Sequence, residues 1–231
     1  MIPADLPRRV RAVAGEMPGG LAVFDADGTL WREDVGEAFL RHLVALGWVK
    51  LPDGSDPYDA YERAVDRDKA SGYAYAAKLL AGLFAEEVAA EAARFAREWV
   101  PPRLVSDTQG LRELCEDAGL VTFVVSASPL PIVLAAAPLA GFSREKCRGI
   151  EVGVRSGRFT DQVVGPITYA RGKVEAASRL GPIALACGDS FTGDLAMLEA
   201  ARIAVVVGPS SGSPLSAEAL RRNWPVLLQD N

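Results

Sequence analysis

The sequence predicts an α/β protein, with a parallel sheet covered by helices on both faces and a block of helices inserted early in the chain. Short apolar runs bounded by turn residues, typical of buried parallel strands, occur at residues 21–24, 120–126 and 183–187. Segments with helical patterning alternate with such runs after residue 104, which is typical of strand–helix–strand units. Strand patterns vanish between residues 32 and 103, where Ala, Glu, Arg and aromatic residues dominate.

These patterns divide the chain into two expected domains. Residues 1–31 and 104–231 form the α/β core, and residues 32–103 form the helical insertion. Proline and glycine punctuation sets the helix ends within the insertion, at Pro52–Pro57, at Ser71-Gly72 and at Pro101-Pro102. The helices expected up to this point cover residues 3–17, 34–47, 57–69, 71–83 and 85–99.

The elements expected after the insertion resume the alternation. Ser156-Gly157 separates two runs that predict a β-hairpin, at 148–155 and 158–164. The strands expected besides the hairpin are 120–126, a run from 183 that ends at Asp189, and 203–208. The helices are 107–118, 129–140, one that begins at Arg171, 194–202 and 215–223.

The first strand ends in the chain's most informative motif, Asp25-Ala26-Asp27-Gly28-Thr29. Side chains two residues apart on an extended chain point the same way, so Asp25 and Asp27 leave the sheet edge side by side. Neighbouring carboxylates repel each other when desolvated, and this pair therefore needs a cation, a shared proton or both. Gly28 permits a tight turn, and Thr29 adds a hydroxyl group.

Further polar residues follow the later strands. Ser126 ends the second apolar run, Lys173 lies at the start of a helix, and Asp189 and Asp194 follow the third run. Because ligands bind outside the carboxyl ends of the strands in open α/β sheets, we expect these side chains to share one site. Ser128, followed by Pro129, is typical of a helix N-cap with proline at the first helical position, so we assign it a structural role.

The ordered motifs from Leu21 to Asp194 resemble those of the haloacid dehalogenase superfamily, and the helical insertion and hairpin resemble its phosphoserine-phosphatase-like branch. The resemblance implies a Rossmann-like core with a type-1 helical cap and Mg²⁺-dependent hydrolysis of phosphomonoesters. Asp25 is then the nucleophile that forms an aspartyl-phosphate, and Asp27 is the acid and base. Ser126 and Lys173 complete the implied catalytic set by holding phosphoryl oxygens.

The same resemblance implies the metal and substrate ligands. Mg²⁺ is expected on Asp25, the backbone carbonyl of Asp27 and Asp189, with Asp194 acting from further out or through water. The spacing of five residues between Asp189 and Asp194 departs from the four that phosphoserine phosphatases tend to use. The residues expected to contact the substrate are Gly28, Thr29, Asp34 and Ala127.

The residues of the insertion argue against phosphoserine as the substrate. Asp34 lies where phosphoserine phosphatases place an acid against the substrate amine, but residues 71–78 offer Lys78 and no arginine for the substrate carboxylate. Acids together with Trp31, Tyr73 and Tyr75 favour a cationic leaving group through charge pairing and cation–π contact. Phosphoethanolamine and phosphocholine therefore precede phosphoserine as expected substrates, unless these aromatic residues simply pack the helical bundle.

Two other functions stay open. A phosphomutase uses the same pair of aspartates, and a non-enzymatic phosphate-binding module can be built on the same scaffold. Haloalkanoate dehalogenases lack the second aspartate of the first motif, so Asp27 argues against their chemistry.

Composition excludes several classes of protein. The net charge of −5 and a pI near 5.1 argue against a nucleic-acid partner. The sequence lacks the roughly 18 consecutive apolar residues of a membrane span, and a charged N-terminal stretch predicts no signal peptide. His42 is the single histidine, which excludes zinc sites built on several histidines. Three cysteines without CxxC spacing are typical of a cytoplasmic protein. We expect the protein to be a monomer or a homodimer and to bind a small phosphomonoester as its substrate.

Overall fold

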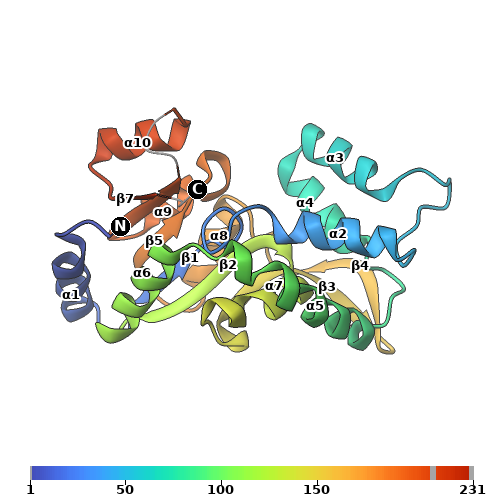
Figure 1. Ribbon diagram of the computed structural model, residues 1–231, viewed down its shortest axis with the longest axis horizontal. Helices are drawn as coiled ribbons and strands as arrows, with labels where there is room; N and C mark the ends of the chain where they lie inside the picture. Colours follow the sequence, from blue (N-terminus) through green and yellow to red (C-terminus); the bar gives the residue numbers. More distant parts are fainter. Residues whose placement is uncertain (1, 209–211, 229–231) are drawn as a thin grey trace.

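A computed structural model describes residues 2–208 and 212–228, and its centre is a seven-stranded sheet in the order β4-β3-β2-β1-β5-β6-β7 (Figure 1). Every neighbouring pair is parallel except the β3–β4 hairpin. The predicted α/β class is therefore confirmed. The strands are β1 (Leu21–Phe24), β2 (Val121–Pro129), β3 (Cys147–Arg155), β4 (Arg158–Val164), β5 (Ile183–Gly188), β6 (Ile203–Gly208) and β7 (Val226–Leu228).

Helices cover both faces of the sheet, as the alternation of strands and helices predicts. Successive residues of β1 divide between two hydrophobic clusters: Ala22 and Phe24 join one, and Leu21 and Val23 the other. This is the two-residue period of a strand buried on both sides. The first cluster includes α1 (Leu6–Glu16), α6 (Ser106–Asp117) and α7 (Leu130–Ala136), and the second includes α8 (Arg171–Ser178), α9 (Phe191–Ala200) and α10 (Pro214–Arg222).

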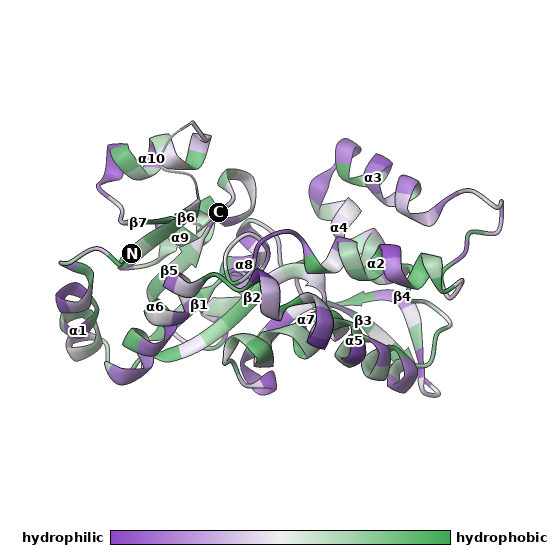
Figure 2. Ribbon diagram, in the orientation of Figure 1, coloured by the Kyte–Doolittle hydropathy of each residue, from purple (hydrophilic) through white to green (hydrophobic). Residues whose placement is uncertain are grey.

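The inserted helices gather at the β3–β4 end of the sheet (Figure 1). Helix α4 contacts β2, β3 and β4, while α5 packs on α7. Helix α3 is largely hydrophilic in Figure 2, as expected for a peripheral helix. Most buried apolar residues of the insertion belong to the same hydrophobic cluster as α1 and α6, and Ala77 of α4 packs in a smaller cluster with Ile150 and Val152 of β3, so packing is continuous across the expected domain boundary. The four helices are α2 (Val35–Ala45), α3 (Pro57–Arg67), α4 (Lys69–Lys78) and α5 (Ala85–Trp99).

The break predicted at Ser71-Gly72 is wrong, because α4 runs through both residues. The chain turns instead at Asp68, whose side chain accepts a hydrogen bond from the Ser71 N–H and caps α4. Gly72 lies where α4 crosses α3: a Cβ atom there would come within 2.5 Å of the Val65 backbone. The glycine permits close helix packing rather than ending a helix.

The second strand is longer than predicted. It continues through Ser128 to Pro129, and α7 begins at Leu130. Ser128 makes no capping hydrogen bond to α7, so its assignment as an N-cap, with Pro129 as the first helical residue, is wrong. The expected helix 129–140 ends early and continues as a 3₁₀ turn, Ala137–Ala140, that contains Pro138.

Helix α4 ends at Lys78, five residues before the predicted end at residue 83. Most other boundaries agree within about three residues, and the hairpin turn at Ser156-Gly157 is confirmed, with both residues at positive φ. Helix α9 begins three residues before its predicted start, at Phe191, because Ser190 caps it through the Gly193 N–H. Strand β7 and the 3₁₀ turns Pro101–Arg103 and Arg144–Lys146 were not predicted. No helix in the described ranges has the length and apolar character needed to cross a membrane.

The sheet order creates a crevice beside β1. From β1 the chain builds outward through β2, β3 and β4, then crosses to β5 on the other side of β1. The connections that follow β1 and β5 therefore diverge, and ligands in open α/β sheets bind at such a point.

Candidate active site

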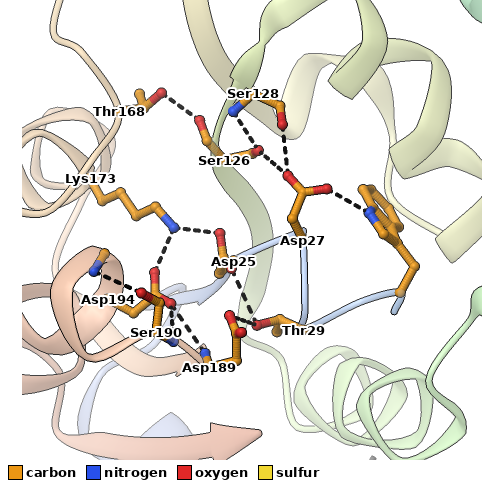
Figure 3. Close-up of polar contacts among 12 residues, drawn as sticks. Asp25, Asp27, Thr29, Ser126, Ser128, Thr168, Lys173, Asp189, Ser190 and Asp194 are labelled. Carbon is orange, nitrogen blue, oxygen red and sulfur yellow. Dashed lines mark hydrogen bonds and ion pairs between the residues drawn. The ribbon is translucent and has the colours of Figure 1, made fainter. Parts of the chain in front are cut away.

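Three strands deliver polar side chains to this crevice. Phe24, the last residue of β1, aligns with Val124 of β2 and Cys187 of β5. β1 ends at this level and β5 ends one residue later, whereas β2 continues past it to Pro129, and this brings Asp25 near Asp189 after β5 and near the last residues of β2 (Figure 3).

Lys173 of α8 is the positive centre of the site. The lysine is almost fully buried, and its Nζ donates hydrogen bonds to Asp25 Oδ1 and, at 2.5 Å, to Asp194 Oδ1. Burial alone would lower the pKa of Lys173, but the charges of Asp194 and Asp25 outweigh it and raise that pKa. Lys173 is therefore a permanent cation between two carboxylates.

The carboxylates outnumber this cation. Oxygens of Asp25, Asp189 and Asp194 lie within 4.8 Å of one another. Burial and then the charge of Asp194 raise the pKa of Asp25 well above its usual value, although Lys173 acts in the opposite direction. Burial and Asp194 likewise raise the pKa of Asp189 to about 7. Three carboxylates share the single positive charge of Lys173, and their hard oxygen donors fit a further cation such as Mg²⁺.

Asp194 is held by neighbours on both of its oxygens. Oδ1 accepts from Lys173, and Oδ2 accepts from the backbone N–H groups of Asp189 and Ser190, at 3.1 and 2.9 Å. A Cβ atom on Gly188 would lie 2.7 Å from Asp194 Cγ, so glycine gives the carboxylate room to reach back over β5. These contacts orient Lys173 and the loop that carries Asp189.

Thr29 lies behind the carboxylates rather than in the cavity. Its hydroxyl is within 3.3 Å of both Asp25 Oδ2 and Asp189 Oδ1, and the residue is fully buried. The structure therefore links Thr29 to the predicted metal ligands and gives it no contact with the cavity expected to hold the substrate.

Asp27 points away from this cluster, and its carboxylate accepts four hydrogen bonds (Figure 3). Oδ1 accepts from the Trp31 Nε1–H at 2.9 Å and from the Val35 N–H, at the start of α2, at 2.7 Å. Oδ2 accepts from the hydroxyls of Ser126, at 3.2 Å, and Ser128, at 2.7 Å. The side chain is held in one orientation by β2, by its own loop and by the inserted helices.

Ser128 is a site residue that the sequence analysis missed. It contacts Asp27 more closely than the predicted Ser126 does, and it lines the cavity, whereas Ser126 is fully buried and accepts a hydrogen bond from the Ser128 N–H. The signal was present in Ser126-Ala127-Ser128, because residues two apart on a strand share a face. Thr168 was also missed; its hydroxyl donates to the Ser126 carbonyl.

A cavity of about 340 Å³ opens above these residues, which is large enough for a small molecule. The predicted residues Gly28, Asp34 and Ala127 line it. Gly28 has φ +77°, and a Cβ atom there would lie 2.2 Å from Asp189 Oδ2. Only glycine therefore lets the first loop pass this close to the carboxylate from β5.

The aromatic residues expected to contact a substrate cation lie in different parts of the structure. Tyr73 lines the cavity and contacts Tyr169 with ring centroids 5.2 Å apart; Tyr169 was not predicted. Trp31 is fully buried and donates a hydrogen bond to Asp27, so the prediction that it contacts a substrate cation is wrong. Tyr75 packs against the hydrophobic core, and Lys78 is exposed and lies outside the cavity.

The fold and this arrangement of carboxylates around a buried lysine define a hydrolase of the haloacid dehalogenase type. The family model described as haloacid dehalogenase-like hydrolase matches residues 22–199, and the chain belongs to that family. Within the family, the resemblance to the phosphoserine-phosphatase-like branch is confirmed by its relatives. One curated relative is the phosphoserine phosphatase SerB1 of Mycobacterium tuberculosis, 24% identical over 97% of this chain and 77% of that protein.

Solved structures share the fold. A protein of unknown function from Bordetella pertussis Tohama I superposes with a TM-score of 0.77 at 21% identity, over 91% of this chain and 99% of that one. A substrate-bound phosphoserine phosphatase superposes with a TM-score of 0.58 at 16% identity, over 86% of this chain and 89% of that one.

Proposed function

We propose that this chain is a Mg²⁺-dependent phosphatase that hydrolyses a small phosphomonoester through an aspartyl-phosphate on Asp25. The observation that carries the proposal is the buried Lys173 between Asp25 and Asp194, with Asp189 beside them and a small-molecule cavity above. Family membership and the phosphoserine phosphatase SerB1 among the relatives support the reaction class.

Asp25 is the nucleophile in this mechanism. Lys173 lowers the pKa of the Asp25 carboxyl against the larger effects of burial and Asp194, and bound Mg²⁺ would favour the ionised form further. The ionised carboxylate attacks phosphorus opposite the leaving oxygen. The P–O bond to the leaving group breaks as the Asp25–phosphorus bond forms. Lys173 also neutralises negative charge that develops on the phosphoryl oxygens.

Asp27 supplies and removes the proton. Its Oδ1 accepts from two N–H groups that cannot reverse their role, so the proton resides on Oδ2. Serine hydroxyls both donate and accept, and Ser126 and Ser128 can therefore bond to either form of Oδ2. Asp27 first protonates the leaving oxygen and then takes a proton from the water that hydrolyses the aspartyl-phosphate.

Asp25, Asp189 and the backbone carbonyl of Asp27 are the proposed Mg²⁺ ligands. Asp194 is a positioning residue in this scheme, because Lys173 and two backbone amides already occupy its oxygens. Bound Mg²⁺ would offset the charge of the carboxylates and of the phosphoryl group.

The proposal is tested with 4-nitrophenyl phosphate. We expect hydrolysis in the presence of Mg²⁺, loss of activity on chelation, and loss in Asp25→Asn. Asp27→Asn should accumulate phosphoenzyme, detected by intact mass, because an aryl leaving group departs without a proton. Asp66→Asn, an exposed carboxylate of α3, is the matched control. Full activity in Asp25→Asn would overturn the nucleophile, and activity after complete removal of divalent metal would overturn the metal requirement.

A further inference from the structure

Thr168 makes a buried contact that none of the proposed catalytic steps uses. It lies in the segment that joins β4 to α8, and only 2% of it is exposed. Its hydroxyl donates a hydrogen bond to the backbone carbonyl of Ser126, in the part of β2 that borders the cavity (Figure 3). The contact therefore joins the segment before Lys173 to the carboxyl-terminal part of β2.

The segment that carries Thr168 has little freedom to move. The Tyr169 N–H donates to the Ile167 carbonyl at 2.7 Å, which closes a γ-turn centred on Thr168. A Cβ atom on Gly172 would lie 1.8 Å from the same carbonyl oxygen, so the turn lies directly against the start of α8. Ala170 is held at φ +49°, a conformation that a non-glycine residue keeps only when its surroundings fix it. These constraints leave the Thr168 hydroxyl at a fixed place relative to α8.

The peptide that receives this hydrogen bond lies where the sheet becomes irregular. Pairing of β1 with β2 stops before this stretch. β2 pairs with β3 at Val125 and again at Pro129, and the register shifts between these two residues. The ladder is thus irregular across residues 126–128. Thr168 supplies a fixed partner for the Ser126 carbonyl in a stretch where regular strand pairing does not set the orientation of the peptides.

The hydrogen bond to Ser126 also sets the direction of the next N–H group. The Ser126 carbonyl and the Ala127 N–H belong to one planar trans peptide, in which C=O and N–H point in opposite directions. Ala127 lines the cavity together with Lys173, whose ammonium group neutralises charge on the phosphoryl oxygens in the mechanism above. Combining this geometry with the proposed phosphatase function, we propose that Thr168 is a positioning residue that holds the Ala127 N–H toward a phosphoryl oxygen of the substrate.

The same segment places Lys173. The backbone N–H of Lys173 donates to the Ala170 carbonyl at 3.1 Å, in the turn that opens α8. Ala170 donates its own N–H to the Gly193 carbonyl, in the first turn of α9, at 3.0 Å. The segment from Thr168 to Lys173 therefore holds the Ala127 amide and the Lys173 ammonium relative to each other, and both act on charge that develops on the phosphoryl group.

Removing the hydroxyl of Thr168 tests this role. Thr168→Val exchanges the hydroxyl for a methyl group at nearly constant shape, and Thr168→Ala removes it with less bulk. Both should lower kcat/KM for 4-nitrophenyl phosphate about tenfold, less than the cost of deleting such a donor outright. Inhibition by orthovanadate, which takes the five-coordinate geometry of phosphoryl transfer, should weaken by a similar factor. Thr168→Ser keeps a hydroxyl and should retain most of the wild-type activity.

The choice of ester separates this role from proton transfer. Every phosphomonoester presents the same phosphoryl group, so the loss in Thr168→Val should be equal for 4-nitrophenyl phosphate and ethyl phosphate. A loss confined to ethyl phosphate, whose leaving oxygen needs a proton, would show that Thr168 acts on Asp27 through Ser126 and would overturn the proposal.

Thr108 offers a matched control for the structural cost. It is fully buried in α6, its hydroxyl donates to the Val105 carbonyl at 2.8 Å, and it lies outside the cavity. Thr108→Val loses the same kind of buried hydrogen bond, so it should lower Tm as Thr168→Val does. It should keep the wild-type values of kcat/KM and of the inhibition constant for orthovanadate.

The wild-type protein gives a measurement that does not depend on the folding of a variant. The amide proton resonance of Ala127 should move downfield when orthovanadate is added with Mg²⁺, because a new hydrogen bond deshields the proton. An unchanged resonance in protein that orthovanadate inhibits would overturn the proposal.

The outcomes separate the two proposals. Wild-type kinetics in Thr168→Val and Thr168→Ala, or an equal kinetic loss in Thr108→Val, would overturn the positioning role and leave the phosphatase standing. A loss in Thr168→Ser as large as that in Thr168→Val would also overturn it. Failure of the wild-type protein to hydrolyse 4-nitrophenyl phosphate and ethyl phosphate alike would overturn both proposals.

Discussion

The raised pKa of Asp189, together with the proposed Mg²⁺ site, predicts that the stability of this protein depends jointly on pH and on Mg²⁺. In the metal-free fold, burial and Asp194 raise that pKa from 3.8 to about 7. An acid that binds its proton more tightly in the folded state stabilises that state below its unfolded pKa, near 4. The stabilisation is lost as the pH rises through about 7. Metal-free protein should therefore lose stability between pH 4 and pH 7, and bound Mg²⁺ should remove this loss.

The magnitude follows from the pKa difference. A rise from 3.8 to about 7 is roughly three pH units, and each unit corresponds to about 1.4 kcal/mol, so the upper bound is about 4 kcal/mol. In a chain of 231 residues, 1 kcal/mol moves Tm by about 2–4 °C. Saturating Mg²⁺ should thus raise Tm by at most about 16 °C at pH 8 and by little at pH 5.

Thermal unfolding with and without Mg²⁺ at pH 5, 6.5 and 8 measures this dependence. Asp189→Asn, which removes the charge at nearly constant shape, should stabilise the metal-free protein at pH 8 and abolish most of the Mg²⁺ shift. Asp66→Asn, on the exposed face of α3, should reproduce the wild-type curves. An equal Mg²⁺ shift at pH 5 and pH 8, or an undiminished shift in Asp189→Asn, would refute the reasoning.

Three further substitutions test single contacts. Ser128→Ala removes the 2.7 Å hydrogen bond to Asp27, and kcat for alkyl phosphates should fall about 10- to 100-fold, the cost of losing a hydrogen bond to a charged group. The loss should be smaller for 4-nitrophenyl phosphate, and equal losses for both kinds of ester would contradict the positioning role. Gly28→Ala forces a Cβ atom to 2.2 Å from Asp189 Oδ2, so calorimetry should show at least tenfold weaker Mg²⁺ binding, and wild-type affinity would contradict this geometry. Ala170→Gly relieves a non-glycine residue at φ +49°, and urea unfolding should show a gain of about 1 kcal/mol, whereas a loss would show that the position is unstrained.

The sequence predicts the site well where chemistry follows directly from a strand end. Asp25 and Asp189 lie next to the last residues of β1 and β5, so locating those two strands was enough to place both carboxylates at one edge. The buried position of Lys173 follows from α8 packing beside the same edge. The partners of Asp27 are harder to predict, because Val35 and Ser128 approach it from different elements, and the shared strand face of Ser126 and Ser128 is the one local signal.

The errors come from local signals that tertiary contacts override. Pro129 is typical of a first helical position, but β2 continues through it because its N-terminal half pairs with β1 and its later residues pair with β3. Gly72 is typical of a helix end, but its missing side chain is what lets α4 lie against Val65. In both cases the deciding neighbour lies on another element, where a reading of the local sequence cannot find it.

The position of β1 has a consequence for how the protein folds. Leu21 aligns with Val121 on one side and with Ile183 on the other, so β1 pairs with strands that lie roughly 100 and 160 residues further along the chain. The residues around Asp25 meet Asp189 only after the second of these pairings has formed. Recovery of Mg²⁺ binding during refolding should therefore coincide with the slowest, most non-local phase, and helical signals should return earlier. Mg²⁺ binding at the proposed site would therefore report when the sheet is complete.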